Sequence, residues 1–140
     1  MFMSIDRFLD AQKGDYEIAL EEIRAGHKTS HWIWYIFPQL KGLGRSSTAE
    51  YYGIADETEA NAYLANDTLR KHLLEISEAL LSLPSNDAED VMGFPDNLKL
   101  RSSMTLFAAA EPELTVFQKV LDKFFQGMPD DKTLELLGRK

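Results

Sequence analysis

The chain of 140 residues contains no cysteine, so disulfide bonds, a thiolate nucleophile and cysteine-ligated zinc or iron–sulfur sites are excluded. Its three histidines, His27, His31 and His72, do not follow a metal-ligand spacing, and we expect neither a metal nor another cofactor. Basic residues are also scarce. With 15 Lys and Arg against 23 Asp and Glu, the net charge of −8 argues against binding to a nucleic-acid polymer, although it is compatible with a local basic pocket.

Long apolar runs are missing as well. No window approaches the roughly 20 apolar residues that span a bilayer, and the N-terminal segment lacks the basic and apolar regions of a signal peptide. We therefore expect a soluble, cytoplasmic protein with no membrane partner. The apolar fraction of 44% and charged fraction of 27% are typical of a globular protein, and the length predicts a single helical domain, residues 1–140.

What the sequence does contain is one dense aromatic stretch, Lys28–Leu40, which holds both tryptophans. Residues Trp32 to Pro38 are all apolar or aromatic, so we expect the side chains of Trp32 and Trp34 to be largely buried. The pattern by itself fits a buried strand as well as a buried helix.

The rest of the chain is dominated by helical periodicity. A cap at Asp67 is followed by apolar residues at regular helical spacing, namely Leu69, Leu73, Ile76, Leu80 and Leu83. Two further helices are predicted, one over residues 97–110 and one that begins after Pro112. No two strand-like runs are joined by a hairpin turn. The predicted fold class is all-α.

The segments Ser30–Leu40 and Lys99–Phe107 resemble motifs of a bacterial family, the domain of unknown function 1810 family. Gly42-Leu43-Gly44 also matches, and weaker matches extend the resemblance over nearly the whole chain. The family consists of small multihelical proteins, so the resemblance implies a compact bundle around the aromatic segment as a buried central helix. Some members carry the label calpastatin. We reject that function because calpastatin-type inhibitors are disordered and polar, whereas this chain is rich in core-forming residues.

His31 stands directly before the aromatic run and is the candidate catalytic acid or base. An imidazole drawn into this apolar setting is expected to be neutral, because burial disfavours its charged form. The alternative is a structural histidine that is hydrogen-bonded to a backbone carbonyl or a carboxylate.

Lys99, Ser102 and Ser103 share one face of the predicted helix over residues 97–110. They are candidates for the polar wall of a ligand pocket, and Asp96 is placed one turn earlier to pair with Lys99. Two alternatives remain open. The serines could allow helices to approach closely, or one could be a nucleophile with Lys99 as its base, although the order is reversed relative to S-x-x-K.

Arg45 lies in a loop rich in glycine and serine, residues 41–47, with Lys28, Lys41 and Arg101 as further cations. An arginine fork suits bidentate binding of phosphate or carboxylate. If this loop folds over the aromatic segment, it brings a cation beside an aromatic ring. The alternative is that these cations are simply solvated.

These residues together predict a pocket for an anionic small molecule, nucleotide-like or phosphate-like, with Lys99 and Arg45 near each other and incompletely neutralised. The predicted pocket is formed by His31, Trp34, Gln39, Arg45, Lys99, Ser102 and Ser103. A protein-interaction module is one alternative function. The other is that these motifs only pack the fold and carry no enzymatic activity.

Overall fold

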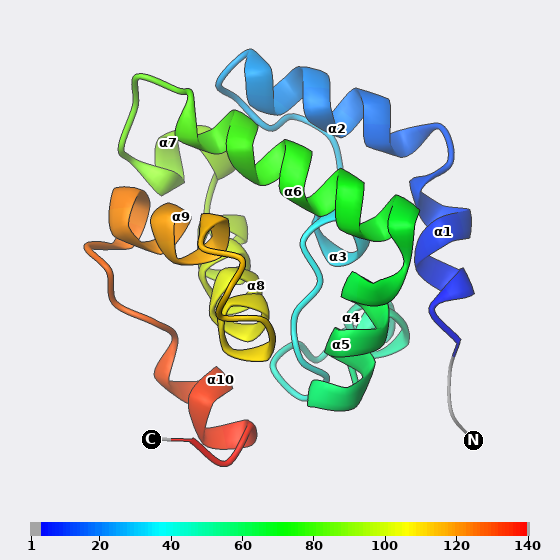
Figure 1. Cartoon of the computed structure of the whole chain (residues 1–140). Helices are drawn as coiled ribbons and strands as arrows, with labels where there is room; N and C mark the ends of the chain where they lie inside the picture. The colour runs from blue at the N-terminus through cyan, green and yellow to red at the C-terminus, as the bar shows by residue number, and fades with distance from the viewer. Residues whose placement is uncertain (1–3, 140) are drawn as a thin grey trace.

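The computed structural model describes residues 4–139, and over these residues the chain is helical throughout, with short connections (Figure 1). The helices are α1 (Asp6–Gln12), α2 (Asp15–Arg24), α3 (Ile33–Ile36), α4 (Ser47–Tyr52), α5 (Glu57–Ala65), α6 (Asp67–Leu81), α7 (Ala88–Met92), α8 (Asp96–Ala110), α9 (Val116–Phe125) and α10 (Asp131–Leu136). The predicted all-α fold class is confirmed. Extended pairing within residues 4–139 is limited to an isolated parallel bridge between Leu40 and Ile54.

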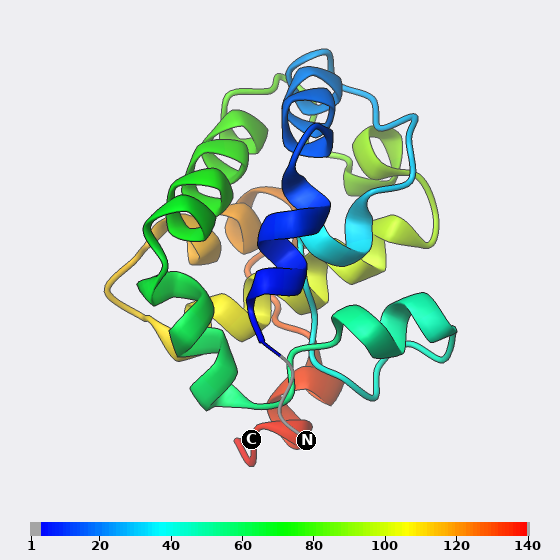
Figure 2. The ribbon, with the colours of Figure 1, turned by 90° about the vertical axis from the view of Figure 1, so that its right-hand side faces the viewer.

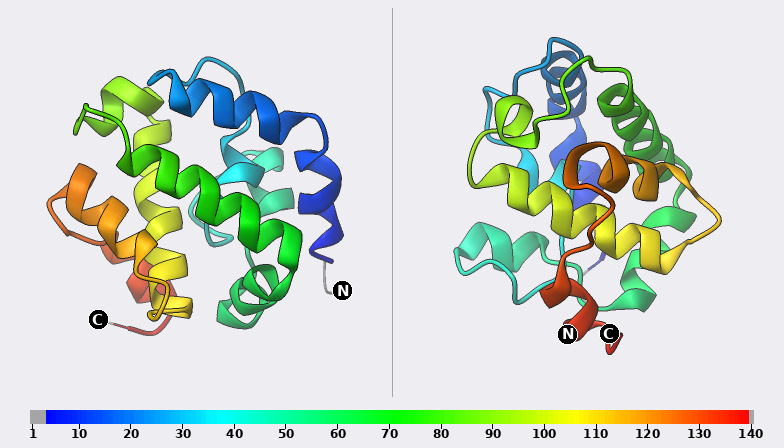
Figure 3. Two further views of the ribbon diagram at one scale, coloured as in Figure 1. Left: turned by 45° about the horizontal axis from the view of Figure 1, so that its top comes forward. Right: turned by 90° about the vertical axis from the view of Figure 1, so that its left-hand side faces the viewer.

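The longest helices form the centre of the bundle. α9 packs against both α6 and α8, α2 covers another side of α6, and α5 contacts both α6 and α8 (Figure 1, Figure 3). α6 and α9 each bury one apolar stripe, which is why the helical period in the sequence predicted them. Among residues 4–139, no helix combines the length and the apolar character needed to cross a bilayer.

The start of α6 illustrates how capping fixes a helix end. The side chain of Asn66 accepts a hydrogen bond from the backbone N–H of Leu69 at 3.0 Å, so Asn66 is the cap and the predicted cap, Asp67, is the first helical residue. Asparagine and aspartate serve equally well in this position, so the sequence could not distinguish them. The predicted stripe of α6 is buried at Leu69, Leu73, Ile76 and Leu80.

The aromatic stretch is helical, as predicted, but over a single turn, α3 (Ile33–Ile36). α3 contacts α1, α4 and α8, and Figure 2 shows it beside α1. The helix stops early because Pro38 disfavours a helical conformation at Phe37 and has no N–H to donate. The chain then runs extended, and the backbone N–H of Lys41 donates to the carbonyl of Ile54 at 2.8 Å.

The two tryptophans differ in burial, which corrects the prediction that both are largely buried. Trp32 is 1% exposed, whereas Trp34 is half-buried and packs against the edge of the core. Trp32 lies just before α3 and Trp34 lies within it, so the two side chains do not belong to one helical stripe.

Arg7 and Glu59 form a buried ion pair that the sequence did not predict. Their Nη1 and Oε2 atoms are 2.8 Å apart, and the side chains are 3% and 1% exposed. Arg7 also donates to the carbonyls of Ser4, Tyr51 and Gly53 at 2.7, 2.8 and 2.9 Å. This pair ties α1 to α5 and satisfies its charges internally, as a buried ion pair must.

Candidate functional site

A surface cleft of about 240 Å³ lies between the loop that follows α3, the first turns of α8 and the start of α10. It is lined by Gln39, Leu43, Gly44, Pro95, Leu98, Lys99, Ser102, Asp130 and Lys132. Three residues of the predicted pocket, Gln39, Lys99 and Ser102, therefore meet in this cleft. We call it the α8 cleft.

Close packing of the glycine-containing loop shapes one wall of the α8 cleft. A Cβ atom on Gly44 would lie 2.5 Å from the Cβ of Ala49 and 3.3 Å from the Nε2 of Gln39. The loop can therefore approach α4 this closely only because residue 44 has no side chain. The hydroxyl of Ser46 then caps α4 by accepting from the N–H of Ala49 at 3.1 Å.

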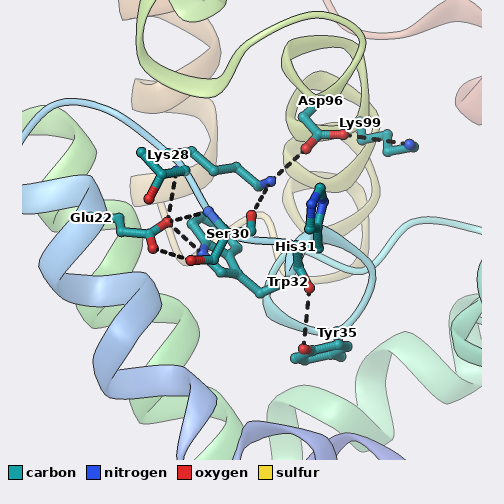
Figure 4. A network of polar contacts seen from close by, with 9 residues as sticks. Glu22, Lys28, Ser30, His31, Trp32, Tyr35, Asp96 and Lys99 are labelled. Carbon is teal, nitrogen blue, oxygen red and sulfur yellow. Dashed lines mark hydrogen bonds and ion pairs between the residues drawn. The ribbon is translucent and has the colours of Figure 1, made fainter.

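Lys99 supplies a positive charge that is only partly neutralised. Its ammonium lies 3.5 Å from Oδ1 of Asp96, while the other carboxylate oxygen, Oδ2, is held at 2.7 Å by the ammonium of Lys28 (Figure 4). Two cations thus share one carboxylate. Lys28 is 6% exposed and Lys99 is 25% exposed, so Lys99 is the one that solutes can reach. The predicted pairing of Lys99 with Asp96 is confirmed.

The ammonium of Lys99 also lies 5.7 Å from the ring centroid of Trp34, within cation–π range. Trp34 does not itself line the α8 cleft. The predicted pocket included Trp34, whereas its ring contacts Lys99 without lining the cleft.

Ser102 and Asp130 form the polar floor of the α8 cleft. The Ser102 hydroxyl lies 3.2 Å from the carbonyl of Leu98 and 3.3 Å from Oδ2 of Asp130, and its one proton can be donated to only one of them. Oδ2 of Asp130 also accepts from the N–H and the hydroxyl of Thr133, at 3.0 and 2.5 Å. This oxygen is therefore occupied as the cap of α10.

Ser103 does not belong to the α8 cleft, which corrects its predicted role as a pocket wall. It is 0% exposed, and its hydroxyl finds no hydrogen-bond partner among residues 4–139. One residue further along a helix rotates the side chain by about 100°, so Ser103 faces the core where Ser102 faces the cleft.

His31 and Arg45 also lie outside the α8 cleft. His31 is exposed, so the prediction of an imidazole in an apolar setting is wrong. The chain turns at Trp32, which enters the core and leaves the preceding residue in solvent. Arg45 is exposed and does not line the cleft, although its neighbour Gly44 does. Among the other predicted cations, Arg101 donates to the carbonyls of Met128 and Pro129 at 3.0 and 3.1 Å.

Glu22, in α2, fixes the loop that leads to α3 (Figure 4). Its carboxylate accepts from the backbone N–H groups of Thr29 and Ser30, each at 2.9 Å. It also accepts from the Ser30 hydroxyl at 2.5 Å and the Trp32 indole N–H at 2.9 Å. Burial by itself raises the pKa of the Glu22 carboxyl, but these four hydrogen bonds outweigh it and lower the pKa from 4.5 to about 2.

The profile of the family described as "Protein of unknown function (DUF1810)" matches residues 2–137. The chain belongs to this family. The resemblance seen in the sequence is therefore confirmed. A crystal structure of the conserved hypothetical protein Rv1873 from Mycobacterium tuberculosis is similar, with 43% sequence identity, a TM-score of 0.94 and coverage of 97% of each chain. No protein with a curated description matches.

Asp130 and Lys132 are the charged residues of the α8 cleft that the predicted pocket did not include. Asp130 followed three residues later by Thr133 is a recognisable helix-cap pattern in the sequence. Nothing local in the sequence indicates that this cap packs against Ser102, which lies 28 positions earlier.

Proposed function

We propose that the α8 cleft binds the phosphate or carboxylate group of a small molecule, with Lys99 as the principal contact. The observation that carries this proposal is the shared carboxylate. Asp96 is 2.7 Å from Lys28 and 3.5 Å from Lys99, so the group of three charges retains one net positive charge at the cleft. A bound anion would neutralise this net positive charge and leave the ion pair between Lys28 and Asp96 intact.

The remaining charges of the α8 cleft are compatible with an anion. Lys132 contributes a second ammonium, and its nearest carboxylate, Glu135, is 3.5 Å away in an exposed pair of little strength. Asp130 is the opposing charge in the lining, but its Oδ2 already accepts from Thr133 and lies within reach of Ser102. The charged residues of the lining, Lys99 and Lys132 against Asp130, together carry one net positive charge.

The size of the cleft restricts the ligand. Sites for drug-sized molecules measure about 300–1,000 Å³, and this cleft measures about 240 Å³. A phosphate monoester or a short dicarboxylate fits these dimensions, whereas a whole nucleotide would extend beyond the rim. The proposal is therefore narrower than the nucleotide-like ligand expected from the sequence.

A protein-interaction surface is the second candidate function, because apolar side chains are exposed beside the cleft. Phe94 is 70% exposed and Leu98, which lines the cleft, is 48% exposed. Failure of every small anion in the experiment below would leave this surface as the better supported function.

Thermal unfolding in the presence of glycerol 3-phosphate, succinate and inorganic phosphate, at constant ionic strength, tests the anion site. A ligand at 100 times its Kd stabilises the folded state by about 2.7 kcal/mol. We expect at least one of these anions to stabilise the wild type and glycerol, the uncharged counterpart of the first, to have no effect. Lys99→Ala should abolish the stabilisation.

Lys119→Ala is the matched control, because Lys119 is exposed on α9 and does not line the cleft. This variant should respond to the anion as the wild type does. The proposal is wrong if no anion stabilises the wild type, or if Lys99→Ala and Lys119→Ala respond equally.

A further inference from the structure

A second cavity, of about 360 Å³, lies between α1 and the first turns of α6. Its lining includes Asp6, Asp10, Gln12, Lys13 and His72, and it shares no residue with the α8 cleft. We call it the α1 cavity. None of these side chains belonged to the predicted pocket.

The hydrogen bonds of Gln12 fix the orientation of its side-chain amide. Gln12 is 4% exposed, and its Nε2 donates to the carbonyl of Tyr35 at 2.8 Å and to the hydroxyl of Tyr63 at 3.0 Å. Both N–H bonds of the amide are thus used, which leaves Oε1 for the 2.7 Å contact with Nδ1 of His72. Because an amide oxygen only accepts, Nδ1 of His72 carries the proton.

The other imidazole nitrogen of His72, Nε2, is consequently the acceptor of the neutral ring. Within residues 4–139 it makes no hydrogen bond and is not buried away from solvent. The ring is held flat against Tyr16, with centroids 3.7 Å apart and an interplanar angle of 8°. Burial lowers the pKa of His72, aided by Lys71 and opposed by Glu75 and Glu17, so the ring is neutral at pH 7.

The charged side chains that line the α1 cavity are mainly negative. Asp6 and Asp10 lie four residues apart on one face of α1 and both line the α1 cavity, while Lys13 is the one cation in the lining. With a neutral His72, two carboxylates and one ammonium leave a net negative charge. Among residues 4–139, no three His, Asp or Glu side chains gather closely enough to hold a metal ion, which favours an organic cation.

We propose that the α1 cavity binds a protonated primary amine, whose N–H donates to Nε2 of His72 while Asp6 and Asp10 balance its charge. Gln12 acts as a positioning residue, because it sets which nitrogen of His72 accepts. This site is independent of the α8 cleft, and the failure of either proposal leaves the other standing.

Nuclear magnetic resonance of the ¹⁵N-labelled protein at pH 7 tests the site with 1,4-diaminobutane as the probe. In the free protein, the imidazole ¹⁵N shifts should identify His72 as the Nδ1–H tautomer. Added diamine should shift the Nε2 resonance of His72 along a saturable curve, and 1,4-butanediol, its uncharged counterpart, should not. The Nε2–H tautomer, or an unmoved Nε2 resonance, would overturn the proposal.

Three exposed side chains provide variants that leave the buried part of the site intact. Asp10→Asn should weaken diamine binding about three- to tenfold, and Lys13→Ala should tighten it by a similar factor, because each changes one charge beside the amine. Glu113→Gln, a control outside the α1 cavity, should leave the affinity unchanged. An anion-binding cavity would give the opposite signs at Asp10 and Lys13, and equal losses at Asp10 and Glu113 would mean non-specific attraction to an acidic protein. Either result overturns the amine site.

Discussion

Trp32 and Trp34 are two positions apart, each has a lysine near its ring, and both lysines reach Asp96, yet their surroundings differ. Lys28 lies 5.0 Å from the ring of Trp32 and 2.7 Å from Asp96, whereas Lys99 lies 5.7 Å from the ring of Trp34 and 3.5 Å from Asp96. The same residue types thus form two different arrangements. We call the arrangement at Trp32 closed, because Trp32 and Lys28 are buried, and the arrangement at Trp34 open, because Trp34 and Lys99 are partly exposed.

The closed arrangement is completed by Glu22, which accepts the indole N–H of Trp32, and by the Ser30 carbonyl, which accepts from the Lys28 ammonium at 2.6 Å. No comparable set of partners surrounds Lys99 among residues 4–139. The difference teaches that the number of hydrogen-bond and ion-pair partners distinguishes these two lysines, whereas residue type does not. Three measurements on matched variants can break or sharpen this comparison.

The largest difference is expected between Trp32→Ala and Trp34→Ala. Trp32 is 1% exposed, so its removal leaves a cavity and unpairs Glu22, which should cost about 3–5 kcal/mol of the free energy of unfolding. Trp34 is half-buried, so Trp34→Ala should lower the free energy of unfolding by only about 1–2 kcal/mol. Urea unfolding of both variants measures these values. Equal losses would contradict the distinction between a closed and an open tryptophan.

Lys28→Ala and Lys99→Ala should differ by a smaller amount. Without Lys28, the carboxylate of Asp96 and the carbonyl of Ser30 lose their closest donor, which should cost about 2–3 kcal/mol. Lys99→Ala should change stability by less than about 0.5 kcal/mol, because its ion pair is long and partly exposed. Denaturation midpoints of the two variants give the comparison. A strong loss for Lys99→Ala would assign this lysine a structural role.

The fold was predictable because helical periodicity is a local signal. The stripe of α6 and the helix that carries Lys99 could be recognised from spacings of three and four residues, and both exist in the structure. Pro38 is a local signal for the end of α3, but the start of α3 could not be predicted in the same way, because Glu22 fixes the preceding loop through hydrogen bonds between distant residues.

The α8 cleft was predictable only where its residues share one helix face or one segment. Lys99 and Ser102 are one turn apart, and Gln39 follows directly on the aromatic run. Lys132 comes from a distant part of the chain, so no local pattern could place it there. The α1 cavity escaped prediction for the same reason, because Gln12 and His72 meet only in the folded chain.

The smallest of the three expected effects is the loss of stability at low pH through Glu22, the hydrogen-bond partner of Trp32. Hydrogen bonds to Glu22 lower its pKa to about 2 in the folded protein, below the ordinary value of 4.5 that it has when unfolded. A carboxyl with a lowered folded-state pKa contributes stability that is fully present above the unfolded pKa and is lost as the pH falls through the folded one. The contribution of Glu22 should therefore disappear between about pH 4.5 and pH 2.

Urea unfolding of the wild type and of Glu22→Gln at several pH values in this window isolates the contribution. The amide cannot titrate and places an N–H where Glu22 accepts hydrogen bonds, so the variant should be less stable at pH 6, with the gap narrowing by about 1–2 kcal/mol toward pH 2. This is less than a full conversion of the shift, because Glu22 is partly exposed. If the difference in the free energy of unfolding between the wild type and Glu22→Gln stayed constant across this pH range, the Glu22 carboxylate would not be stabilised by its hydrogen-bond donors. The surroundings of Trp32 would then not differ from those of Trp34 in the way described.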